Sequence, residues 1–142
     1  MKRIKYLFFV LCLFSSCSKS NYDGLYVFDE DAFKAAFATD VTSKDMTPET
    51  QQIADQVLTG VLAEFRNFTI ELKGAEAVAT FRKEVTKATL KPVSSSGSEA
   101  ILAMTPVDEA IKNQVANLHI SGTKLVLDDG SKESGKLYFI KK

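Results

Sequence analysis

The sequence predicts an α+β fold: a mainly antiparallel β-barrel or curved sheet of about eight short strands, with an N-terminal helical hairpin inserted after the first strand. Two observations lead to this prediction. Over residues 29–65 apolar side chains recur every three to four positions, which is typical of amphipathic helices, and after residue 67 they alternate with polar ones, which is typical of half-buried strands. The strand-like segments follow one another at spacings of about ten residues, as in antiparallel barrels and sandwiches.

The first strand and the first helix are expected to be contiguous. Leu25 and Val27 alternate with Tyr26 and Phe28 over residues 24–28, which predicts a strand. Asp29 is a suitable N-cap, and the acidic residues that follow it favour a helix start because they face the positive end of the helix dipole. An apolar stripe then follows, formed by Phe33, Ala36 and Phe37. Residues 39–44 are polar and predict a break.

A second helix of about 17 residues is predicted to begin at Thr47, whose hydroxyl can cap it, with Pro48 at the first helical position. Its apolar residues recur every four positions, at Ile53, Val57, Val61 and Phe65. Two successive amphipathic helices form a helical hairpin that needs an apolar surface to lie on. We therefore expect the hairpin to cover the sheet.

The remaining strands are expected at residues 68–72, 77–82, 85–93, 99–104, 115–121, 124–127 and 137–140. Residues 73–75 predict a turn, and the serine-rich residues 94–98 predict a flexible connection. One helical turn is expected within residues 106–113, and a long polar turn begins at residue 128.

The N-terminus has the layout of an export signal. A positively charged start, Met1 to Lys5, is followed by an apolar run over residues 6–14. This run is shorter than the roughly 20 apolar residues that a membrane-spanning helix requires. Residues 1–16 are therefore predicted to be a signal peptide.

The end of this signal, residues 13–17, resembles the lipobox of lipoproteins cut by the bacterial lipoprotein signal peptidase. Two small serines precede Cys17, and Phe14 stands where the family usually has a branched aliphatic residue. The resemblance implies cleavage before Cys17 and covalent attachment of diacylglycerol and an N-acyl chain to it. Cys12 does not fit, because the bulky Leu11 precedes it. No other cofactor is expected.

A conventional secretory signal, cut near Ser16 or Ser18, is the alternative. The number of cysteines favours lipidation. Cys17 is the only cysteine left once the signal is removed, so no intramolecular disulfide can form. Residues 17–22 are then a lipidated cysteine with a short tether, and residues 23–142 form the domain. Residues 18–21 span only about 14 Å, so the domain is expected close to the lipid surface. Ser18 and Lys19 include no inner-membrane retention aspartate, a resemblance that favours the outer membrane of a diderm envelope.

The predicted mature chain is mildly acidic. The full chain has 18 basic and 18 acidic residues, and the three basic residues of the signal leave 15 against 18. This balance, without a basic stripe, argues against nucleic-acid binding.

The order of elements is similar to that of small lipocalin-like lipoproteins. The resemblance rests on residues 24–26 in the first strand, the helical excursion, and the strand-like residues 118–127 and 137–139. Tyr26 stands where the lipocalin Gly-x-Trp motif has tryptophan. The resemblance implies a barrel, and with it carriage of a small apolar ligand as an alternative function.

Several polar groups are candidate catalytic or metal-binding sites. His119, the only histidine, alternates with Leu118 and Ile120 and is expected in solvent, so a zinc site of the usual ligands cannot form. A Ser-His-Asp triad is formally possible, but nothing resembles a nucleophile elbow. The acidic residues 29–31 are explained by the helix start. A solvated turn is favoured over a calcium loop for the group Asp128, Asp129, Ser131 and Glu133.

The candidate ligand-contacting residues are those of the two helical stripes: Phe33, Phe37, Val57, Val61 and Phe65. Such a stripe either lines a pocket for an apolar ligand or simply belongs to the core. The leading functional expectation is a membrane-anchored, non-enzymatic envelope lipoprotein that binds a protein partner or a small molecule. The alternatives are a carrier of a small apolar ligand and a hydrolase.

Overall fold

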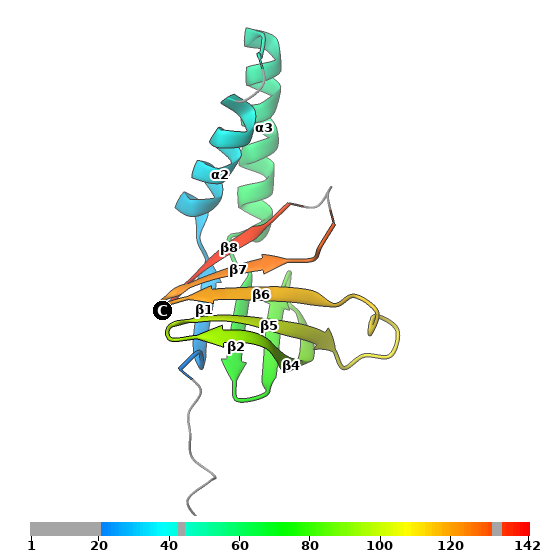
Figure 1. The fold of residues 1–142 in the computed structure, drawn as a ribbon. Coiled ribbons are helices and arrows are strands. Elements are labelled where there is room, and N and C mark those ends of the chain that lie inside the picture. The colour runs from blue at the N-terminus through cyan, green and yellow to red at the C-terminus, as the bar shows by residue number, and fades with distance from the viewer. Residues whose placement is uncertain (1–20, 43–44, 132–134) are drawn as a thin grey trace, which may run out of the picture.

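The computed structural model describes residues 21–42, 45–131 and 135–142. The predicted signal peptide, Cys17 and Glu133 lie outside these described residues. Within the described residues, the chain forms a closed antiparallel barrel of eight strands, and two helices stand beyond one end of it (Figure 1). The closed barrel confirms the predicted fold class. None of the described helices combines the length and apolarity needed to cross a bilayer.

The barrel is a simple meander in which every strand pairs with its neighbours in the chain, and β8 returns to pair with β1. The strand bounds are β1 Gly24–Phe28, β2 Thr69–Lys73, β3 Glu76–Phe81, β4 Glu84–Ser96, β5 Glu99–Pro106, β6 Ala116–Ser121, β7 Lys124–Asp128 and β8 Leu137–Lys141. The order agrees with the period-two pattern of the sequence. Every backbone edge of the sheet is paired, because the barrel closes on itself.

Alternation along the strands places one face of each strand in the barrel interior. In β6, for example, Ala116, Leu118 and Ile120 are buried while the residues between them are exposed. The largest fully buried side chains come from five different strands: Tyr26, Phe139, Ile70, Leu118 and Leu125. Small alanines, such as Ala77 and Ala88, lie among them. The barrel interior is therefore filled by its own side chains, as expected for a barrel of this size.

The two helices, α2 (Glu30–Thr42) and α3 (Pro48–Phe65), begin where local signals predicted. The Asp29 carboxylate accepts a hydrogen bond from the backbone N–H of Ala32 at 3.0 Å, and the Thr47 hydroxyl accepts one from the N–H of Thr50 at 3.3 Å. Both are N-cap contacts. The predicted break at residues 39–44 is wrong at its start, since α2 continues to Thr42. Thr39 does not interrupt the helix, because its hydroxyl donates to the Ala35 carbonyl within it.

Two further predictions are corrected in β4 and after β5. Residues 94–98 were expected to be a flexible connection, but β4 runs to Ser96, where Ser95 and Ser96 pair with β5 beyond a bulge. Backbone pairing outweighs the low strand propensity of serine there. Pro106 ends β5, and residues 107–113 form bends and turns and no helix, with hydrogen bonds from the N–H of Ile111 to the Asp108 carbonyl and from the N–H of Gln114 to the Ile111 carbonyl.

The helical hairpin, defined here as α2 and α3, stands on one end of the barrel and extends beyond it (Figure 1). The expectation that it covers the sheet is not what is found. Leu62 is the single buried residue of α3, and it lies near the barrel end of the helix. The other end of the barrel holds the start of the described chain, where the Asp23 carboxylate accepts a hydrogen bond from the N–H of Gly74 at 2.9 Å in the β2–β3 turn.

Candidate functional site

The helical hairpin is joined to the barrel by an aromatic cluster at the barrel mouth. Phe65 of α3 stacks on Phe81 with ring centroids 5.0 Å apart, and Phe33 of α2 lies 5.6 Å from Phe28. Phe139 of β8 meets Phe68 edge to face at 5.0 Å. Each such pair adds about 0.5–1.5 kcal/mol beyond area burial. Phe33 and Phe65, two of the candidate ligand-contacting residues, therefore attach the hairpin to the core.

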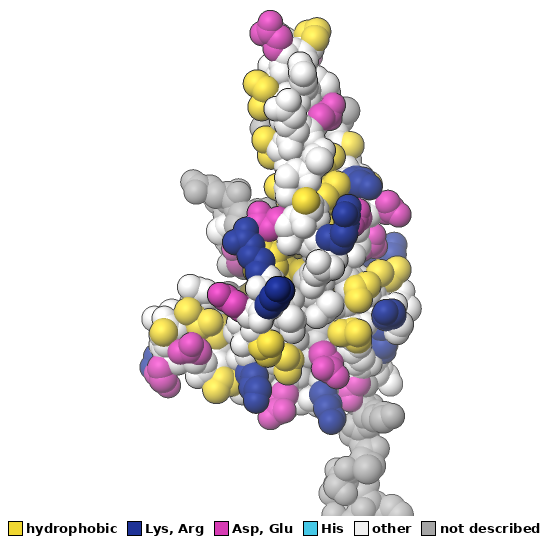
Figure 2. Space-filling model, turned by 180° about the vertical axis from the view of Figure 1, so that it is seen from behind, with side chains coloured by type: hydrophobic (Ala, Val, Ile, Leu, Met, Phe, Trp, Pro, Cys, Tyr) yellow, Lys and Arg dark blue, Asp and Glu magenta, His cyan; other side chains and the backbone are white. Residues whose placement is uncertain are grey.

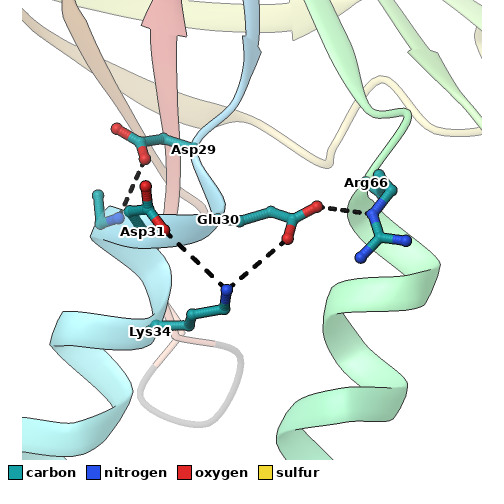
Figure 3. A network of polar contacts seen from close by, with 6 residues as sticks. Asp29, Glu30, Asp31, Lys34 and Arg66 are labelled. Carbon is teal, nitrogen blue, oxygen red and sulfur yellow. Dashed lines mark hydrogen bonds and ion pairs between the residues drawn. The ribbon is translucent and has the colours of Figure 1, made fainter.

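A polar network on the surface reinforces the same joint (Figure 3). Arg66, just after α3, donates from Nε to Glu30 of α2 at 2.7 Å, and Lys34 lies 3.9 Å from the same carboxylate. The hydrogen bond from Arg66, with the charges of Arg66 and Lys34, holds the pKa of Glu30 below its ordinary value. A second ion pair links Glu64 of α3 to Arg82 after β3. The bases of both helices are thus tied to each other and to the barrel.

Above this joint, an open groove of about 500 Å³ lies between the helical hairpin and the last two strands. We call it the hairpin groove; its lining comprises Phe33, Phe37, Val61, Phe65, Leu127, Asp129, Gly135 and Leu137. Its volume falls within the roughly 300–1,000 Å³ typical of small-molecule sites. Four of the five candidate ligand-contacting residues are brought together here. Sequence reasoning missed the opposite wall, formed by Leu127 and Leu137, although their strand alternation marks them as inward-facing.

The fifth candidate residue, Val57, lies elsewhere. It is 52% exposed and does not line the hairpin groove, and Ile53, one turn earlier in α3, is 60% exposed. Figure 2 shows hydrophobic side chains along the outer part of the hairpin and acidic side chains at its far end, whereas basic and acidic side chains are mixed at its base and on the barrel. The distal hairpin therefore presents apolar side chains to solvent instead of burying them.

The barrel interior offers a ligand no comparable space. Tyr26 is fully buried, and its hydroxyl donates to the Tyr22 carbonyl at 3.0 Å. Burial raises the pKa of this phenol. At the barrel end opposite the hairpin, an apolar depression near Tyr22 and Leu102 measures about 210 Å³, below the usual range for a ligand site. The hairpin groove, at about 500 Å³, is more than twice the size of this depression.

The acidic groups considered as cation ligands have structural roles. Asp29 caps α2, and Glu30 pairs with Arg66. In the turn after β7, Asp128 accepts from the N–H of Gly130 and Asp129 from the N–H of Ser131, both at 2.9 Å. These are Asx turns, in which the side chain satisfies its own loop. Within the described ranges, no group of three or more histidine, cysteine or carboxylate side chains could hold a metal ion.

His119 lies on the outer face of β6 and is exposed, as its alternation predicted. It borders a shallow depression with Ser94, Ser121 and Glu99. Ser121 donates to Glu99 at 3.4 Å, but in the part of the chain that the structure describes no hydrogen bond joins either residue to His119. A nucleophile requires an adjacent base for activation, and this arrangement does not provide one.

Comparisons with protein-family models, curated proteins and solved structures gave no match to this chain.

Proposed function

We propose that this protein is a lipid-anchored envelope lipoprotein whose barrel holds a helical hairpin out as a non-enzymatic binding module. The observation that carries the proposal is the pair Ile53 and Val57, which leave more than half of their side-chain surface in solvent on the outer part of α3. Exposed apolar side chains gathered on a projecting element are typical of interaction surfaces. The filled barrel supports a scaffolding role for the sheet.

The described chain begins at the end of the barrel opposite the hairpin. Cys17 lies outside the described residues, but Asp23 already sits at the β2–β3 turn, away from the helices (Figure 1). A lipid on Cys17, four residues before the first described residue, would hold that end against the bilayer, in the outer membrane by our proposal. The hairpin would then point away from the lipid, into the aqueous space. The proposal also includes a relationship between this domain and the lipocalin-like lipoproteins.

The anchor is tested by replacing Cys17 with serine and following palmitate labelling and detergent-phase partitioning. The proposal expects both to be lost. A matched Cys12→Ser variant should retain both, because Cys12 is removed with the signal. Labelling that persists in Cys17→Ser would contradict the anchor.

The binding module is tested by photo-crosslinking in cells. A photoreactive amino acid at position 57 should give a discrete partner adduct, whereas the same group at position 107 on the barrel should not. Val107 is a fair control because it is 60% exposed, similar to the hairpin positions. The absence of an adduct from positions 53 and 57, or equal adducts from position 107, would overturn the proposal.

The hairpin groove favours a second candidate function, carriage of a small apolar ligand. Its space of about 500 Å³ is bounded on both sides by apolar side chains, such as Val61 and Leu137. Native mass spectrometry of protein from mild detergent should then reveal a bound apolar molecule that a groove-filling Val61→Trp variant lacks. A ligand-free wild-type spectrum would refute carriage under that condition. Labelling with a serine-directed fluorophosphonate would instead point to the hydrolase alternative.

A further inference from the structure

The exposed apolar side chains of α3 form a row. Glu49, Ile53, Val57 and Val61 follow one another at four-residue intervals, so they lie along one face of the helix. Ile53 and Val57 are exposed, and Val61 is half-buried where the row reaches the hairpin groove. From Ile53 to Val61 the row spans about 12 Å of helix, two turns or slightly more. This matches the spacing at which one helix recognises another in a groove.

Space beside the row permits close approach. Gly60 lies three residues after Val57, and a side-chain carbon placed on it would meet no atom within 4 Å. A helical partner could therefore approach the α3 backbone closely at this point.

Charge distinguishes the hairpin from the rest of the chain. Residues 29–66 contain eight acidic and three basic residues, a net charge of minus five. The remainder of the predicted mature chain, from residue 18, contains ten acidic and twelve basic residues, a net charge of plus two. In the outer part, residues 38–59, there are four acidic residues and one basic residue: Asp40, Asp45, Glu49, Asp55 and Lys44. The apolar row thus lies within a negative field.

The negative charge of the hairpin distinguishes between possible binding partners. The hairpin of a second copy would bring minus five against minus five, and like charges facing one another across an interface are unfavourable. An anionic lipid surface is disfavoured for the same reason. A partner with an apolar face flanked by basic residues complements both the apolar row and the negative charge around it.

We infer that the outer face of α3 is a docking site for a cationic amphipathic helix of a protein partner. The inference rests on the proposed function and deepens it by assigning the partner's chemistry. The partner's apolar residues would pack on Ile53, Val57 and Val61, and lysine or arginine side chains at the edge of its apolar face would lie near Glu49, which is on the same face of α3.

The test uses the processed lipoprotein in nanodiscs of zwitterionic phosphatidylcholine, with empty nanodiscs as background. Fluorescence anisotropy follows a labelled synthetic helix with an apolar face flanked by lysines, and the same helix with glutamates in place of the lysines. The cationic helix should bind about tenfold or more tightly than the acidic one. Its affinity should fall several-fold from about 50 mM to about 300 mM salt, as counter-ions screen the attraction.

Three variants make the test specific. Replacing Ile53 and Val57 together by serine should weaken the cationic helix about tenfold, whereas replacing Val85 and Val107 on the barrel should not change its affinity; each control residue is 60% exposed. Reversing Asp45, Glu49 and Asp55 to lysine should switch the preference to the acidic helix. These surface changes leave the core intact, which circular dichroism verifies.

Equal binding of the two helices, or a preference that survives the charge reversal, would overturn the inference. So would a hairpin-dependent dimer in sedimentation, or binding to anionic vesicles that Ile53 and Val57 control. If position 57 still crosslinks a partner in cells, the proposed function stands while the assigned chemistry fails. If it crosslinks nothing, both fail.

Discussion

The barrel has a buried apolar interior, whereas the helical hairpin buries little apolar surface along most of its length. In the barrel, inward-facing residues such as Leu118 and Phe139 are almost completely buried, and backbone pairing runs around the whole circumference. In the hairpin, α3 buries Leu62 alone, and Ile53 and Val57 remain in solvent. Their charges also differ in sign, minus five for residues 29–66 and plus two for the rest of the predicted mature chain.

The difference indicates a division of work. The barrel is stabilised by its own interior and needs no ligand to complete it. The aromatic cluster and the Glu30–Arg66 pair hold the base of the hairpin on the barrel. The outer part of the hairpin exposes apolar side chains to solvent. A region that keeps apolar surface exposed is the better candidate for binding. Matched substitutions in the two regions test this difference.

The largest expected effect is in the barrel mouth. Phe139→Ala should lower the free energy of unfolding by about 3–5 kcal/mol, because it removes a buried ring that contacts Phe28 and Phe68. In the hairpin, Val57→Ala should change it by less than about 0.5 kcal/mol. Guanidinium unfolding followed by circular dichroism measures both. Similar losses in the two variants would remove the contrast.

A smaller effect is expected at the buried phenol. Tyr26→Phe should cost about 1 kcal/mol at neutral pH by leaving the Tyr22 carbonyl without its donor. Burial, with the nearby Asp23 charge, raises the Tyr26 pKa in the folded state, so wild-type stability is fully present below the unfolded value of about 10 and falls as pH rises above it. Unfolding midpoints between about pH 8 and pH 11 should therefore decline less in Tyr26→Phe. An unchanged alkaline slope would contradict this.

Two glycine substitutions should have opposite signs. Gly60→Ala, within α3, should stabilise by about 0.5–1 kcal/mol because alanine is the better helix former and the site is open. Gly74→Ala should destabilise by about 1 kcal/mol, because its φ of +61° in the β2–β3 turn disfavours a side chain. Thermal melts of both variants test the pair. Destabilisation by Gly60→Ala would mean that α3 is not a regular exposed helix there.

The smallest effect is expected at the joint of the two regions. Glu30→Gln removes the ion pair with Arg66 on a partly exposed surface, where such pairs contribute little. Because the Glu30 pKa is lowered on folding, its contribution is present above the unfolded value of about 4.3 and is lost as pH falls through the folded value. Stability measured from about pH 7 to pH 3 should therefore fall less in the variant than in the wild type. Parallel curves would exclude a role for this pair.

Local signals in the sequence predicted much of the fold. Asp29, Thr47 and Pro48 mark both helix starts, because capping depends on a few neighbouring residues. Alternation predicted all eight strands of the described barrel. The errors arose where tertiary pairing prevailed over propensity, as at Ser95 and Ser96, which β5 recruits into the sheet.

The candidate site was only partly readable. The four-residue recurrence in α3 identified Val57 and Val61 equally, because an apolar stripe does not say how far along the helix its support extends. Val61 lies close enough to the barrel to line the hairpin groove, whereas Val57 lies beyond it. This difference depends on how the closed barrel is assembled from strands far apart in the sequence. Leu127 and Leu137 are far from the hairpin in the sequence and come next to it only when the barrel folds.

The pairing of β1 with β8 has a kinetic consequence. Tyr26 lies opposite Lys141, and the N–H of Lys142 donates to the Leu25 carbonyl at 2.9 Å, so closure joins strands more than a hundred residues apart in the chain. Such non-local contacts slow folding, because a long loop must be ordered before they form. A chain that emerges N-terminus first must hold β1 unpaired on one side until β8 arrives. During that interval both strands have open edges that can pair with another chain. Assembly of this barrel is therefore most vulnerable to aggregation just before its last strand docks.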